Sequence, residues 1–219
     1  MVYNPNNNST VIALGDFMVN WQTGYTADVP GEVVTGVPLP PALWTPVANS
    51  LKWHPIAGAK SNTEFFSVAV HWAQATDVND TLSQWFWSIP TSGGAYVEYL
   101  NCMVDLGGVN TVTPVAAVEN ADWDAGGLPT LAALSSTQAN SLALALFVDD
   151  DFGYNTLGVP TGWTHFAYPN WGEPSYNPNC CAIDAFSLSL PNVASTGPVT
   201  TTMGGDSGYG ALVILNGTP

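Results

Sequence analysis

Runs of β-branched and aromatic residues recur along this chain at intervals of about ten residues, with glycine, proline and asparagine between them. This spacing, with turn residues between the runs, is typical of all-β domains. We therefore expect an all-β fold, an antiparallel β-sandwich of the jelly-roll type. The clearest expected strands are Thr63–Gln74, Thr81–Pro90, Ala95–Val104, Leu142–Asp149, Cys181–Leu190 and Gly208–Leu215.

Three segments are interpreted from their own residues and their neighbours. Leu142–Asp149 has the propensity of a helix, but the polar residues before it and the aspartates after it favour a buried strand. Ala95–Val104 is apolar on both faces, which predicts a central strand covered on both sides. Asp105–Pro129 is expected to be a long connection that crosses to the other half of the sandwich. The predicted core comprises Trp44, Phe66, Val70, Trp72, Phe86, Leu100, Leu144, Leu146, Trp163, Phe186, Leu188, Leu212 and Ile214.

Two similar stretches lie in the two halves of the chain. Gly36–Ala48 reads GVPLPPALWTPVA, and Gly158–Gly172 reads GVPTGWTHFAYPNWG. Each has a Gly-Val-Pro lead, a short turn and then Trp-Thr, at Trp44 and at Trp163. Chance coincidence of common residues is the alternative. The shared pattern predicts one sandwich whose two sheets are entered by similar elements.

The first 35 residues are the best candidate for an arm that reaches another chain, with residues 36–219 forming the jelly-roll sandwich. The start is rich in asparagine, and four prolines between Thr23 and Pro41 forbid a helix there. An ordinary edge strand of the sandwich is the equally weighted alternative. The residues expected to make the arm's contacts are Val11, Ile12, Leu14, Phe17, Val19 and Trp21.

Charge excludes several classes of partner. Lys52 and Lys60 are the only cations among 219 residues, and the formal net charge is −15. Nucleic acid binding depends on basic side chains that displace counterions, so we exclude it. Binding to an anionic membrane surface is disfavoured for the same reason. The carboxylates are expected to be solvated, to bind cations or to face a basic partner.

The cysteines and the first residues of the chain indicate the cellular compartment in which the protein is made. Cys102, Cys180 and Cys181 lack the spacing of a metal site, so buried or free thiols are expected, with a disulfide from Cys102 to one of the pair as the alternative. The start, MVYNPNNNST, has neither the basic nor the apolar region of a signal peptide. No uncharged apolar run reaches the roughly 20 residues of a membrane helix. We expect synthesis in the cytoplasm without processing.

The order of these motifs resembles the concanavalin-like jelly-roll domains that are widespread in structural proteins of tailed bacteriophages. The likeness lies in SSTQANSLAL (Ser135–Leu144), the PTGWT that ends at Thr164, and the terminal GALVIL. Those domains read P-x-G-W-T twice, and the first copy departs here, with Ala42-Leu43 where the family has Ala-Gly. The likeness covers roughly residues 36–216.

The resemblance implies a virion component, made in the host cytoplasm, whose partners are copies of itself and other virion proteins. A single domain without heptads or a shaft repeat favours capsid decoration over a tail fibre, although a tail position stays open. A carbohydrate-binding module that recognises a host-surface glycan is the first alternative. A glycoside hydrolase of concanavalin-like fold is the second.

No catalytic constellation stands out in the sequence. Hydrolysis of a glycoside requires two carboxylates about 5–10 Å apart. The nearest cluster, Glu119, Asp122 and Asp124, is followed by glycines and a proline, as in a loop. The three histidines accompany no G-x-S-x-G nucleophile motif. We therefore expect a protein that is not an enzyme and needs no cofactor.

Two weaker binding sites are considered. Within the Asp149–Asp151 cluster, Asp149 and Asp151 point the same way if the stretch is extended, and Ca²⁺ would relieve their repulsion; an exposed turn is the simpler alternative. The aromatic residues Trp163, Phe166, Tyr168 and Trp171 lie close together and form a candidate sugar-stacking set. A core role is the alternative, since tryptophan buries a large apolar area.

Overall fold

The computed structural model of the chain describes residues 17–26, 33–34, 44–46, 52–55, 65–74, 91–92, 97–123, 130–149, 159–167, 182–201 and 208–218. All regular elements within these ranges are β-strands, and every strand pairing is antiparallel. The expected all-β class is confirmed for this part of the chain. Nor do these residues include a helix that is long and apolar enough to cross a membrane.

The first large sheet is drawn from the first half of the chain. Its strands in spatial order are β3 (Thr45–Pro46), β5 (Phe65–Gln74), β1 (Phe17–Thr26) and β7 (Val97–Leu106), with β4 (Lys52–Pro55) also pairing with β5. Aromatic and β-branched residues fill these strands, as a pleated surface favours. A two-stranded sheet of β2 (Val33–Val34) and β6 (Thr91–Ser92) accompanies it.

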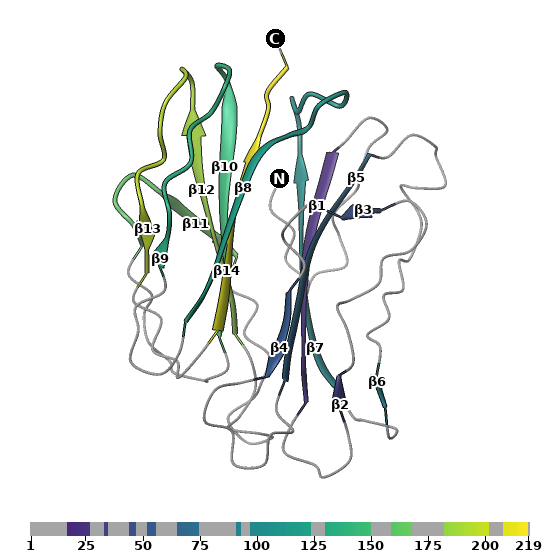
Figure 1. Cartoon of the computed structure of the whole chain (residues 1–219). Helices are drawn as coiled ribbons and strands as arrows, with labels where there is room; N and C mark the ends of the chain where they lie inside the picture. The colour runs from purple at the N-terminus through teal and green to yellow at the C-terminus, as the bar shows by residue number, and fades with distance from the viewer. Residues whose placement is uncertain are drawn as a thin grey trace.

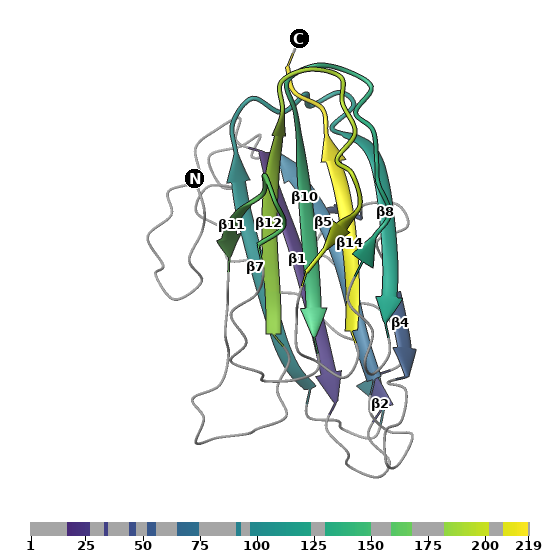
Figure 2. The same cartoon turned by 90° about the vertical axis from the view of Figure 1, so that its left-hand side faces the viewer.

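The second large sheet is drawn from the second half. Its strands in spatial order are β11 (Thr164–Ala167), β12 (Ala182–Leu190), β10 (Ser141–Asp149), β14 (Gly208–Leu215) and β8 (Val115–Trp123). A small sheet of β9 (Thr130–Leu131) and β13 (Val199–Thr200) lies on its side away from the first sheet (Figure 1). Figure 2 shows the second sheet as a layer in front of the first.

The two large sheets share one strand order. The order β3-β5-β1-β7 in the first is matched by β11-β12-β10-β14 in the second. The two similar stretches do lead into equivalent strands, because each Trp-Thr pair opens the short edge strand of its own sheet. The prediction that they enter the sheets is wrong, because β1 precedes β3 in the first sheet and β8 and β10 precede β11 in the second. β3 begins at Thr45 and β11 at Thr164.

The register is shared as well. In the first sheet Phe17 pairs with Gln74 and with Leu106. In the second, Leu142 pairs with Ser189 and with Leu215. The edge strands follow the same rule. Thr45 pairs with Trp72, two residues before Gln74, and Thr164 pairs with Ser187, two residues before Ser189. The halves of the chain therefore repeat one four-stranded unit, and β8 is an additional strand of the second sheet.

The expectation that Asp105–Pro129 is only a connection is wrong. The segment does lead from the first sheet to the second, but it contains β8, which pairs with β14 from Gly208 to Leu215. The strand has the sequence VAAVENADW, whose alanine, asparagine and glutamate have low strand propensity. Pairing with β14 overrides that propensity.

The expected arm differs from the structure over Phe17–Thr26. These residues form β1, which lies between β5 and β7 in its own sheet, so both of its edges are paired. Phe17 is 1% exposed and stacks on Trp72 with ring centroids 5.3 Å apart. Val19 and Trp21 lie in the same strand. The other expected arm residues, Val11, Ile12 and Leu14, lie outside the described residues.

Both faces of the second sheet are covered. One face forms a cluster with the small outer sheet, comprising Leu131, Ala143, Ala145, Phe147, Trp163, Phe186, Leu190, Val199, Leu212 and Ile214. Leu144 and Leu146 alternate with this set along β10 and are also buried, on the face toward the first sheet. This double burial explains why the LALALF run of β10 is continuously apolar and forms a strand.

Most of the predicted core residues that can be placed are buried. Trp44, Leu144, Leu146, Trp163, Phe186, Leu212 and Ile214 are buried, whereas Trp72 and Leu188 are half-buried. Phe66, Val70 and Leu100 lie in described strands, but their side chains lie outside the description, as does all of Thr81–Pro90.

Candidate interaction surface

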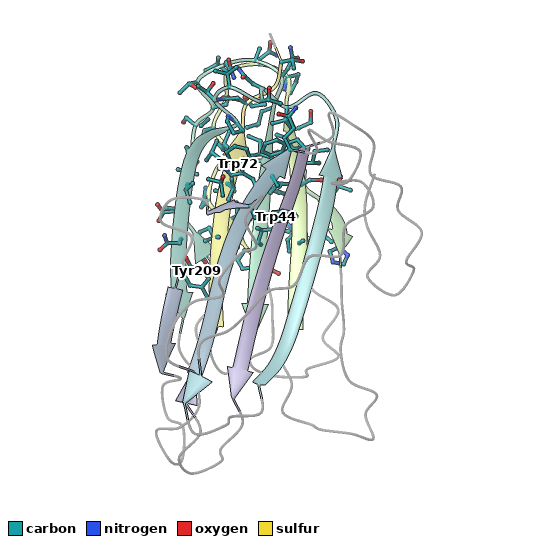
Figure 3. The ribbon with its side chains drawn as sticks, turned by 90° about the vertical axis from the view of Figure 1, so that its right-hand side faces the viewer. Trp44, Trp72 and Tyr209 are labelled. Carbon is teal, nitrogen blue, oxygen red and sulfur yellow. The ribbon has the colours of Figure 1, made fainter. Side chains whose placement is uncertain are left out.

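One end of the second sheet is covered by three loops and the last residues of the chain. We call this surface the cap and define it as residues 107–113, 132–140, 191–198 and 216–218. None of these residues is Asp, Glu, Lys, Arg or His, although the whole chain carries a net charge of −15. Figure 3 shows the loops of the cap, with their side chains, at one end of the molecule.

Backbone hydrogen bonds join the first loop to the residues that follow β14. The Asn110 N–H donates to the Asn216 carbonyl at 2.8 Å, and the Asn216 N–H donates to the Pro114 carbonyl at 2.8 Å. The Thr218 N–H donates to the Gly108 carbonyl, also at 2.8 Å. The Asn216 side chain, 7% exposed, adds a bond from Nδ2 to the Thr113 carbonyl at 2.7 Å. This part of the cap is a short extension of the sheet.

The other two loops are joined through a buried serine. The Ser136 hydroxyl accepts from the Ala194 N–H at 3.1 Å and donates to the Ala194 carbonyl at 3.3 Å. The Ser136 N–H also donates to that carbonyl, at 2.9 Å, and Ser136 is 2% exposed. Thr196 repeats the arrangement with Leu134, through its N–H at 2.8 Å and its hydroxyl at 3.1 Å. Backbone and hydroxyl hydrogen bonds therefore join these two loops without ion pairs.

The outer surface of the cap is neutral and partly apolar. Val112 is 87% exposed and Val193 63% exposed, and the exposed residues around them are Ser, Thr, Asn, Ala, Gly and Pro. Among the described residues outside the cap, Val159 is also an exposed hydrophobic residue, at 48%, and it belongs to the segment that leads into β11. Because the cap has no charged group, it suits contacts made by backbone hydrogen bonds and apolar burial.

The predicted sugar-stacking set is divided by the structure. Trp163 is only 8% exposed and belongs to the core cluster, so its ring faces are not open to a sugar. A turn places it there, in which the Trp163 N–H donates to the Pro160 carbonyl at 3.0 Å. Gly162 supplies the positive φ of 85° that the third position of a type II turn requires. Phe166 lies in β11, with its side chain outside the description, and Tyr168 and Trp171 lie outside the described residues.

The predicted metal and catalytic residues are not brought together in the part of the chain that the structure describes. Asp149 is the last residue of β10, and Asp151 lies outside this part. No group of three His, Cys, Asp or Glu side chains that could hold a metal ion occurs within it. Glu119 and Asp122 lie in β8 rather than in the expected loop, and Asp124 lies outside. His165 is exposed, with its ring 5.2 Å from that of Phe186.

Sequence reasoning did not identify the cap. Its signal was the absence of charge from several separate loops, and nothing in the sequence indicates that these loops meet. No protein-family model, curated protein or solved structure matches the chain.

Proposed function

We propose that this chain is a non-enzymatic structural component of a bacteriophage virion, a surface module attached to the capsid or tail. The proposal includes the finer fold, a concanavalin-like jelly roll in which the two large sheets form one sandwich. The motif likeness over Ser135–Leu144 and Pro160–Thr164 supports the family. The antiparallel strands in two layers are compatible with that fold.

The observation that carries the proposal is the neutral, hydrogen-bonded cap. Copies that carry a charge of −15 repel one another and any acidic neighbour. Attachment is least opposed where the surface has no charge, and the cap is such a surface. Burying an exposed valine contributes about 1.5–3 kcal/mol, whereas an exposed ion pair contributes about 0–1 kcal/mol. Val112 and Val193 are therefore the expected anchors of attachment.

Virions purified from the source of this sequence provide the first test. Gold-labelled antibody against the chain should decorate regular positions on the particle, and their location decides between capsid and tail. Particles without label, in a preparation where the chain is expressed, contradict the proposal.

Variants of the full chain test whether the cap makes the contact. Val112→Asp and Val193→Asp each add a charge to the cap, and binding to particles stripped of the native protein should fall at least tenfold. Val159→Asp adds the same charge to a valine outside the cap and is the matched control. Equal loss in all three variants would assign the effect to charge in general and remove the cap from the proposal.

The two alternatives remain outcomes of further tests. A glycan array bound by the chain, with no affinity for particles, would favour carbohydrate recognition, although the burial of Trp163 removes one expected stacking residue. Glycan turnover that is lost on Glu119→Ala or Asp122→Ala would favour a hydrolase.

A further inference from the structure

We propose that the outer edge of β7, the edge that does not pair with β1, accepts an added strand from residues 10–14 of a second copy of this chain. The inference rests on the proposed function in assembly, and it names the contact between copies. The added strand would run antiparallel to β7 and extend the first sheet.

The repeat between the two sheets identifies this edge. β14 occupies in the second sheet the place that β7 occupies in the first, as the shared order and register show. β14 is paired on both edges, with β10 on one side and with β8 on the other. β7 pairs with β1, and no described strand lies on its other edge. Figure 2 shows β7 at the left-hand edge of the rear sheet.

This position differs from the expected central one. The apolar pattern of Ala95–Val104 indicated cover on both faces, and a strand can be covered on its faces while one edge stays available. An edge of ten residues presents a row of N–H and C=O groups to a further strand. Strand addition to such an edge gains its affinity from main-chain hydrogen bonds.

Residues 10–14 have the composition of an added strand. The segment reads TVIAL, with β-branched residues at three of its positions, and residues 1–15 carry no charged side chain. β7 contains Glu98 and Asp105. If β7 paired with β7 of another copy over its full length, each Glu98 would face an Asp105, and like charges placed opposite each other destabilise a sheet. An uncharged strand avoids this repulsion.

The strand must come from a second copy because of chain length. Five residues in a strand cover about 16 Å. A segment antiparallel to β7 would run away from the end at which Phe17 pairs with Leu106, and the chain would then have to return to Phe17. Leu14 and Phe17 are only three residues apart, which spans about 11 Å at most. A segment from another copy has no such return to make.

Photo-crosslinking of the full chain tests the contact directly and needs no virion. p-Benzoylphenylalanine is placed at Ile12, unlabelled and heavy-nitrogen-labelled copies are mixed, and the crosslinked peptides are mapped by mass spectrometry. We expect crosslinks between an unlabelled and a labelled copy that map to Val97–Leu106. The same group at Asn7, outside the expected strand, is the matched control and should crosslink that strand at least tenfold less.

Sedimentation velocity provides a second measurement. Ile12→Pro removes a strand N–H and should weaken self-association at least tenfold, whereas Asn7→Pro should leave it unchanged. Crosslinks within one copy, crosslinks to another part of the second copy, or a chain that stays monomeric at all concentrations would each overturn the inference. Attachment through the cap would still stand after any of these results, because the particle experiment measures it separately.

Discussion

Gly217 lies directly against the backbone of Asn140, so that a side-chain carbon on residue 217 would collide with the Asn140 carbonyl. This contact joins the residues after β14 to the loop before β10. Asn140 itself has a positive φ of 56°, a conformation that asparagine tolerates better than most residues. The cap therefore depends on close backbone packing between segments about 77 residues apart in sequence.

Gly217→Ala should destabilise the protein, because the backbone of one of the two segments must move to admit the methyl group. Overpacking of this kind costs about 1–3 kcal/mol. Chemical denaturation measures the change in unfolding free energy. Gly107→Ala is the matched control in the same cap, since a Cβ there meets nothing within 4 Å. Equal costs at both positions would show that the contact with Asn140 does not exist in solution.

Asn216→Asp should cost more than about 2 kcal/mol at neutral pH, because a carboxylate oxygen would replace the Nδ2 donor that faces the Thr113 carbonyl in a buried site. Asn110→Asp is the control. The Asn110 Oδ1 accepts from the N–H groups of Val112 and Thr113, at 3.0 and 3.2 Å, and a carboxylate keeps that role. Thermal unfolding of both variants should separate them clearly, and a neutral Asn216→Asp would contradict the buried hydrogen bond.

Gly210→Ala tests the packing inside the second sheet. An added Cβ would lie 3.0 Å from Cδ1 of Phe147 and 3.2 Å from Cδ2 of Leu131, so a cost of about 1–3 kcal/mol is expected. Phe147→Leu makes room at the same point. The double variant should be destabilised by less than the sum of the two single variants, and the difference should exceed about 0.5 kcal/mol. Additive costs in a double-mutant cycle would show that the two residues do not touch.

Gly162→Ala should cost about 1–2 kcal/mol through backbone strain alone. The φ of 85° disfavours a side chain, and no atom lies within 4 Å of the added carbon. Gly162→Asn should recover part of this cost, because asparagine tolerates positive φ better than alanine does. Unfolding measurements that rank alanine at or above asparagine would contradict the turn before Trp163.

Attachment to the particle should survive high salt. The cap contributes no charged group. The Debye length, over which salt screens charges, falls from about 10 Å at 0.1 M to about 3 Å at 1 M salt. Repulsion between acidic copies is then reduced, so binding should be unchanged or stronger at 1 M sodium chloride. Binding that falls steeply with salt would point instead to a basic partner for the carboxylates.

The sequence alone determined the all-β fold class and the positions of several strands. Alternation and β-branched content placed β5 and β14, and the turn residues on either side decided in favour of a strand for β10, because these signals depend on the residue's own neighbours. The repeated Trp-Thr pairs also located the start of a short edge strand in each sheet. In each case a local pattern was sufficient.

Tertiary structure decided what depends on distant partners. β8 forms because it pairs with β14, although several of its own residues have low strand propensity. Phe17–Thr26 became an interior strand rather than an arm because both of its edges meet long strands of the same sheet. The same β-rich composition suits either role, and only the pairing distinguishes them. Burial decided between the core role and the sugar-stacking role that the sequence left open for Trp163. The cap arose because loops far apart in sequence meet at the same end of one sheet.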